Sequence, residues 1–161
     1  MKKIFALILV LCMALSLCAC GKEKAPEPET LGQMLYTDFT AKVNAGETEP
    51  QALADGLLSS GMLPFDGVSM EVEPGWLMGF SADIEGFEKA VMFGPAIGAI
   101  PFVGYVFQLE SADACEAFCA KLLANCDPRW NICTEADETA CGSAENLVFF
   151  VMCSNESEDA Q

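Results

Sequence analysis

The sequence predicts an α+β domain in which a mostly antiparallel sheet of about four to five strands packs with about three helices. Two segments with helical spacing come first, strand-like runs follow, and one more helical segment precedes a closing hairpin. The domain is expected to span residues 31–153, a length typical of a single compact unit.

The three helices are predicted from capping and spacing signals. Thr30 opens the capping box TLGQ, and apolar residues then recur at helical spacing until the chain reaches Gly46. A second, shorter helix has Pro50 in its first turn and ends before Gly61. Residues 111–126 predict the third helix, because an apolar stripe recurs there at helical spacing. That stripe consists of Cys115, Phe118, Cys119, Leu122 and Cys126.

The predicted strands differ in their patterns. Residues 67–72 alternate, as in a strand half exposed to water, and residues 90–109 read as two buried strands joined by a Gly/Pro turn. The apolar side chains of the first strand are Val68, Met70 and Val72. The chain closes with ETAC, a GSAEN turn and the run 147–152. Both alternating faces of this last run are apolar, which predicts a central, buried strand. Such strands need cover on both sides, so the helices need not share one face of the sheet.

The segment 91–107 also has to be considered as a membrane span, because it carries no charge. It lies at the lower limit of length for a spanning helix. It also contains Pro95, Pro101 and several glycines, which break helices and suit turns. These residue types favour the two strands.

The first 20 residues carry the pattern of an export signal, with two lysines followed by an apolar run to Leu17. A peptidase that hands a cysteine to a lipid needs a small residue before that cysteine. Only Cys20, after Ala19, meets this condition, because Cys12 and Cys18 follow leucines. The stretch from Leu17 to Cys20 therefore resembles the lipobox of bacterial lipoproteins, which implies cleavage after Ala19 and a diacylglyceryl anchor on Cys20. An ordinary secretory signal is the alternative.

This pattern divides the chain into a signal peptide (1–19), a lipid-anchored flexible tether (20–30), the domain, and a disordered acidic tail (154–161). The protein is then expected on the extracytoplasmic face of the cell membrane. Loss of the two lysines of the signal changes the formal net charge from −16 to −18. This charge excludes nucleic acid as a partner, because phosphate binding needs a basic surface.

The sequence offers no catalytic residues. The chain contains no histidine, which excludes Ser-His-Asp and Cys-His mechanisms and argues against catalytic zinc. It has no phosphate loop, and the acidic segment with Glu135, Asp137 and Glu138 lacks the spacing and the glycine of a calcium loop. We therefore predict no metal site and no cofactor, and we interpret the acidic segment as a solvated turn.

Six cysteines remain after the anchor: Cys115, Cys119, Cys126, Cys133, Cys141 and Cys153. An even number in an exported domain is typical of disulfides, and Cys133 with Cys141 is the pair to test first. The alternative is a fully reduced set, because three of these cysteines lie on the helix stripe and can act as small buried hydrophobes.

Three residues are candidates for a binding surface. Trp76 and Trp130 each lie beside a turn with polar neighbours, a common setting for aromatic residues that contact a partner. Arg129 is the sole arginine and can meet a carboxylate or an anionic ligand. The structural alternatives are core packing for the tryptophans and a local salt bridge, which we favour, for Arg129.

The lipobox, the run GFSADIEGFEKAVMFGPAIGAIPFVGYVFQLESADACEAF and the closing segment RWNIC…ADETACGSAENLVFFVM together resemble small lipoproteins of Gram-positive gut anaerobes. These lipoproteins carry a domain of unknown function. The resemblance implies a surface location and a compact α/β domain, and it supplies no catalytic residues.

The leading functional hypothesis is a non-enzymatic, membrane-tethered domain that binds a protein or small-molecule partner. One alternative is a thiol-based redox protein that uses cysteines of the 115–153 region. A second is a membrane-integrated component with residues 91–107 as its span.

Overall fold

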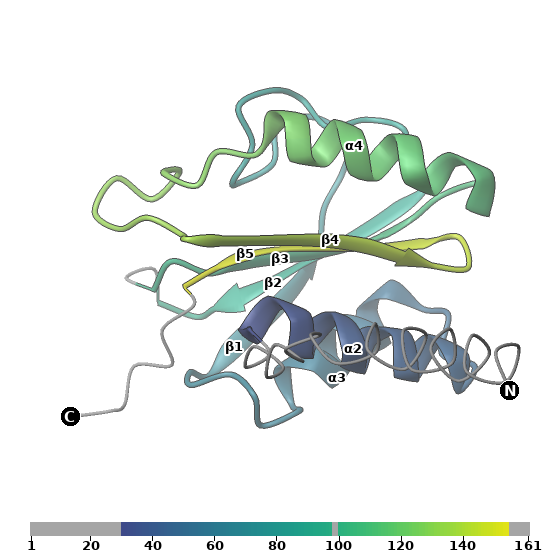
Figure 1. Cartoon of the computed structure of the whole chain (residues 1–161), viewed down its shortest axis with the longest axis horizontal. Coiled ribbons are helices and arrows are strands. Elements are labelled where there is room, and N and C mark those ends of the chain that lie inside the picture. Colours follow the sequence, from purple (N-terminus) through teal and green to yellow (C-terminus); the bar gives the residue numbers. More distant parts are fainter. Residues whose placement is uncertain (1–29, 98–99, 155–161) are drawn as a thin grey trace, which may run out of the picture.

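A computed structural model describes residues 30–97 and 100–154. They form one antiparallel sheet of five strands with helices on both faces (Figure 1). This confirms the predicted α+β class, the single domain, and the number of strands and helices. The predicted signal peptide, the anchor Cys20, the tether before Thr30 and the tail after Ser154 lie outside the described residues.

The strands follow one another in the order β1-β2-β3-β5-β4, and all neighbouring pairs are antiparallel. The elements are, in chain order, α2 (Leu31–Asn44), α3 (Pro50–Leu58), β1 (Gly67–Glu71), β2 (Lys89–Pro95), β3 (Val103–Gln108), the 3₁₀ turn η1 (Ala112–Ala114), α4 (Cys115–Asn125), β4 (Glu138–Ala144) and β5 (Leu147–Cys153). Helices α2 and α3 cover one face of the sheet and α4 covers the other (Figure 1). Strands that are apolar on both faces indicated such a division of the helices.

The first two helices begin where their capping signals predict. The Thr30 hydroxyl accepts a hydrogen bond from the backbone N–H of Gln33, and the Gln33 side chain accepts one from the backbone N–H of Thr30. Pro50 occupies the first turn of α3. Both helices bury an apolar stripe on the sheet, formed by Leu35, Phe39, Val43, Leu53 and Leu57.

Residues 91–107 do not form a spanning helix. They contribute to β2 and β3, in which Val91 pairs with Val106 and Phe93 pairs with Gly104. In the part of the chain that the structure describes, no helix has the length and apolar character to cross a membrane. The two buried strands that the sequence favoured over a span are therefore confirmed.

Strand β1 alternates as predicted, but its apolar face is the more exposed one. Val68 and Met70 are 42% and 48% exposed on the α4 side of the sheet. On the other side, Ser69 accepts a 2.6 Å hydrogen bond from the Gln51 amide of α3. The polar face of β1 therefore packs under a helix, because α3 presents polar partners there, and the apolar face lies beyond the reach of α4.

The closing hairpin is tighter than predicted. Residues 142–144, expected in the turn, belong to β4 and pair with β5, so only Glu145 and Asn146 connect the strands. Glu145 adopts a left-handed conformation with φ 55°, as two-residue hairpin turns require. β5 lies between β3 and β4 and is fully buried, which confirms the prediction of a central strand.

Candidate functional site

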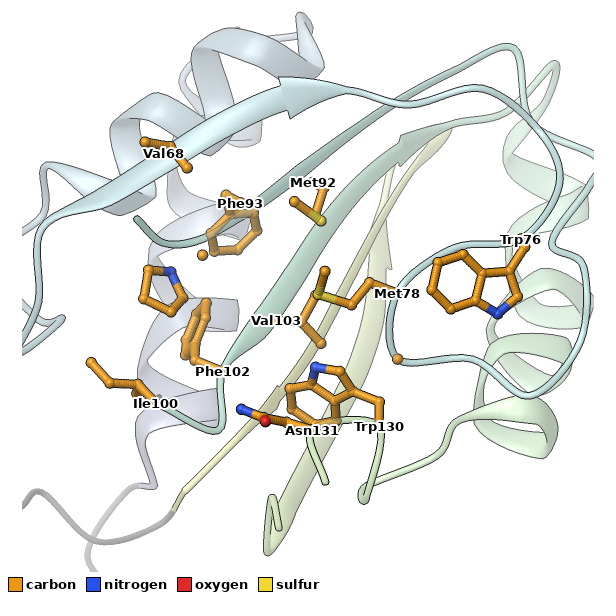
Figure 2. A pocket seen from close by; sticks show the side chains of 13 residues that line it. Val68, Trp76, Met78, Met92, Phe93, Ile100, Phe102, Val103, Trp130 and Asn131 are labelled. Carbon is orange, nitrogen blue, oxygen red and sulfur yellow. The ribbon is translucent and has the colours of Figure 1, made fainter. Parts of the chain in front are cut away.

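An apolar groove lies on the α4 face of the sheet, next to strand β1 (Figure 2). Helix α4 packs against β4 and β5, at the opposite edge. The middle of the face is covered by the segment between β1 and β2, which buries Leu77, Phe80, Ile84 and Phe87. The groove is thus the part of the face that neither the helix nor this segment covers.

The groove has a volume of about 330 Å³ and is open on one side. Its main side chains are those of Val68, Trp76, Met78, Met92, Ile100 and Trp130. Figure 2 shows Met78 and Met92 pointing into the middle of the groove, with Trp76 at one end and Ile100 at the other. Among the described lining residues none is charged, and the polar side-chain groups are the amide of Asn131 and the indole N–H groups of the two tryptophans.

Backbone hydrogen bonds hold the segment that carries Trp76 and Met78. Gly75 and Ile84 exchange two backbone hydrogen bonds of 3.0 and 2.8 Å. These bonds hold together the two ends of the loop 76–83, which begins with Trp76. The buried hydroxyl of Tyr105 donates a 2.7 Å hydrogen bond to the carbonyl of Met78. These contacts fix the backbone while Trp76 itself remains 70% exposed.

The segment that carries Trp130 is joined to the same wall. The backbone N–H of Asp127 donates to the Gly79 carbonyl at 2.9 Å, and Trp130 in turn donates to the Asp127 carbonyl at 3.1 Å. Trp130 is partly buried against the core. The two tryptophans are far apart in sequence, but they line one groove because backbone hydrogen bonds join the two segments that carry them.

Arg129 does not share this groove. Its Nε atom donates to Oε2 of Glu135 at 2.8 Å, and both side chains are mostly exposed. This is the local salt bridge that we favoured for Arg129. Its neighbours Trp130 and Asn131 line the groove, so sequence proximity alone does not assign Arg129 to the site.

The acidic segment is structural at its C-terminal end. Glu138 begins β4, and its carboxylate accepts hydrogen bonds from the hydroxyl of Thr30 and from the backbone N–H of Gly32 in α2. Glu135 is paired with Arg129. Within residues 30–97 and 100–154, no three acidic or thiol groups cluster in a way that would hold a metal ion.

The structure does not join Cys133 to Cys141, and all six described cysteines are free thiols. Cys133 is exposed on the loop beside Arg129. Cys141 is half-buried on β4 and turns toward α4, where its thiol forms a hydrogen bond with Cys119. Cys141 lies beside Cys119 because the alternation of β4 directs its side chain into the α4 layer.

Met78, Met92 and Val68 line the groove but were not predicted to do so. The alternation of residues 67–72 was visible, but a sequence does not tell which face of an edge strand a helix will cover. Met78 and Met92 carry no local signal, since a single methionine beside a turn or in a strand is ordinary. The position of α4 over the far edge of the sheet is what exposes them.

Comparison with known proteins supplies no functional assignment. No protein-family model, curated protein or solved structure matches this chain.

Proposed function

We propose that this protein is a non-enzymatic binding domain, tethered at the extracytoplasmic face of the membrane through Cys20, whose groove holds an uncharged apolar ligand. The observation that carries the proposal is that both tryptophans of the chain line one groove whose described residues include no charged side chain. Exposed apolar surface of this kind is typical of interaction sites.

The dimensions of the groove support a ligand of small-molecule size. Its volume of about 330 Å³ lies at the lower end of the range for ligand pockets. Indole rings offer a large apolar contact area with little conformational freedom to lose, and methionine side chains adapt to different shapes. A ligand in the groove would therefore contact Met78 and Met92 in the middle and Trp76 at one end.

The charge of the protein restricts the ligand. The chain has 24 acidic and 8 basic residues, so its field repels anions. The groove contains no lysine or arginine among its described residues to offset that repulsion. A neutral molecule is consequently favoured over a fatty acid or another apolar anion.

The test uses the polypeptide from Gly21 to Gln161 and the neutral apolar dye Nile red. We expect saturable binding, seen as a rise in dye emission, with the dye also shielding tryptophan from acrylamide quenching. Trp76→Ala should weaken the affinity about tenfold without changing the unfolding midpoint, because this side chain is largely exposed.

The matched control is Leu123→Ala, which removes a 48% exposed apolar side chain from α4, outside the groove. This variant should bind the dye like the unaltered protein. An equal loss of affinity in both variants, or emission that rises without saturation, would show that the dye adheres to apolar surface in general and would contradict the proposal.

A further inference from the structure

Two cysteines from different layers of the fold meet between α4 and β4. Cys119 lies on the helix and Cys141 on the edge strand packed beneath it, and their thiols are hydrogen-bonded to each other. Both side chains are half-buried against the same core. We propose that Cys119 and Cys141 form a reversible dithiol–disulfide site that exchanges with disulfides outside the protein.

The fold holds both side chains in place. Cys141 pairs with Phe150 of the buried strand β5, so its position and the face toward which it points are set by the sheet. Cys119 follows the buried Phe118 and precedes the buried Leu122 by one turn of α4. Because helix and strand are both anchored by buried neighbours, the two sulfur atoms stay close without a disulfide.

Three of the other described cysteines direct their thiols elsewhere. Cys115 donates to the carbonyls of Ser111 and Glu145, Cys126 donates to the carbonyl of Leu123 at 3.2 Å, and Cys153 donates to Glu138. Cys133 is exposed on a loop. Among the described cysteines, only Cys119 and Cys141 are hydrogen-bonded to each other.

The pair is asymmetric, which assigns the two roles. The hydrogen bond donated by Cys141 lowers the pKa of Cys119, against a smaller opposing effect of burial. The same hydrogen bond, burial and the nearby Cys119 and Cys126 thiols raise the pKa of Cys141. Cys119 is thus the thiol that ionises first and, being half-exposed, the one that an external disulfide can reach.

The reaction balances as two exchange steps. The Cys119 thiolate attacks a disulfide R–S–S–R, forming a Cys119–S–S–R bond and releasing RS⁻, which takes up a proton. The negative charge on Cys119 is then gone, so the pKa of Cys141 falls, and its thiolate attacks the Cys119 sulfur. The Cys119–Cys141 disulfide forms, the second RS⁻ leaves, and the protein has lost two electrons to the external disulfide.

The experiment places the full chain in buffers of reduced and oxidised glutathione at several ratios. Free thiols are then alkylated with iodoacetamide, and the digested protein is mapped by mass spectrometry. We expect the peptides with Cys119 and Cys141 to lose alkylation together and to appear as one linked species, which dithiothreitol reverses. At neutral pH, Cys119 should be alkylated about tenfold faster than Cys141 in the reduced protein.

Two variants separate the roles. Cys141→Ser should stop at the first step, with glutathione held on Cys119, whereas Cys119→Ser should leave Cys141 unmodified. Cys126→Ser is the matched control and should retain the linked peptide. Linkage of Cys141 to Cys126 or Cys133 in the unaltered chain, or full alkylation of both thiols at every glutathione ratio, would overturn the proposal without any variant.

Discussion

The backbone N–H of Gly32 donates a 3.0 Å hydrogen bond to Oε2 of Glu138, so the first residue of β4 closes the first turn of α2. The other carboxylate oxygen accepts from the hydroxyl of Thr30. A negative charge at this end of a helix also favours the helix dipole. One side chain therefore joins the beginning of the domain to its last hairpin.

Replacing Glu138 by alanine should destabilise the domain by about 1–2 kcal/mol. The backbone N–H of Gly32 and the hydroxyl of the cap residue Thr30 would both lose their acceptor. The measurement is the free energy of unfolding in urea. Glu135→Ala is the control, since its exposed ion pair with Arg129 should contribute less than about 0.5 kcal/mol. Equal effects of the two substitutions would contradict this role of Glu138.

Gly104→Ala should destabilise the sheet by about 1–3 kcal/mol, because a Cβ atom there would lie 2.3 Å from the ring of Phe93. Gly94→Ala, in the neighbouring strand, provides the comparison. Its Cβ would lie 3.4 Å from the Phe102 carbonyl oxygen, a contact that a small shift can relieve. Thermal unfolding of both variants tests the difference, and a Gly104→Ala protein as stable as the Gly94→Ala protein would refute it.

Burial raises the pKa of Tyr105 above the ordinary value of about 10. The raised pKa favours folding while the hydroxyl is protonated, so this contribution is complete below pH about 10 and is lost as the pH rises through the folded-state pKa. Unfolding in urea at pH 8 and at pH 11 should show a smaller decline for Tyr105→Phe than for the unaltered protein.

At pH 8 the same Tyr105→Phe variant should be less stable by about 1 kcal/mol, because the Met78 carbonyl loses its donor. Tyr36→Phe serves as the control for the loss of a tyrosine hydroxyl whose acceptor, the Ser143 carbonyl, lies at the surface. An alkaline decline that is identical in all three proteins would show that Tyr105 does not contribute to it.

The two tryptophans should differ in their response to acrylamide. A Trp130→Phe protein retains Trp76, which is 70% exposed, and should be quenched strongly. A Trp76→Phe protein retains the partly buried Trp130 and should be quenched less. Addition of Nile red should reduce quenching in both proteins, because both rings line the groove; protection of only one of them would place the dye outside it.

The lipid anchor that we propose on Cys20 predicts that Cys20→Ser moves the protein from the membrane fraction to the soluble fraction of its own cell. The intact mass of the unaltered protein should equal residues 20–161 plus a diacylglyceryl group, because two acyl chains give stable attachment. Cys18→Ser is the control and should leave both mass and location unchanged. An unlipidated chain cut elsewhere would contradict the anchor.

Elements with local signals could be predicted from the sequence. The Thr30 capping box, Pro50 in the first turn of α3 and the apolar run from Leu147 each specify their structure within a few residues. Residues 142–144 are predicted as part of the turn from their sequence, but they pair with β5 and extend the strand. Gly142 is instead required by the ring of Tyr36, which packs against it.

The candidate site could be predicted only in part. Trp76 and Trp130 were individually recognisable, but their meeting depends on the hydrogen bond between Asp127 and Gly79, which no local pattern specifies. The partnership of Cys119 and Cys141 depends in the same way on how α4 lies across β4. From the sequence, Cys133 was the first partner to test for Cys141, because spacing along the chain does not show which layers of the fold come into contact.

The contact between Gly32 and Glu138 has a geometric consequence for a tethered domain. The chain enters the fold at β4, whereas the groove lies at β1, at the other edge of the sheet and on the other face from α2. Four strand spacings separate these edges by about 19 Å. The start of the folded domain and the opening of its groove therefore lie at opposite edges of the sheet.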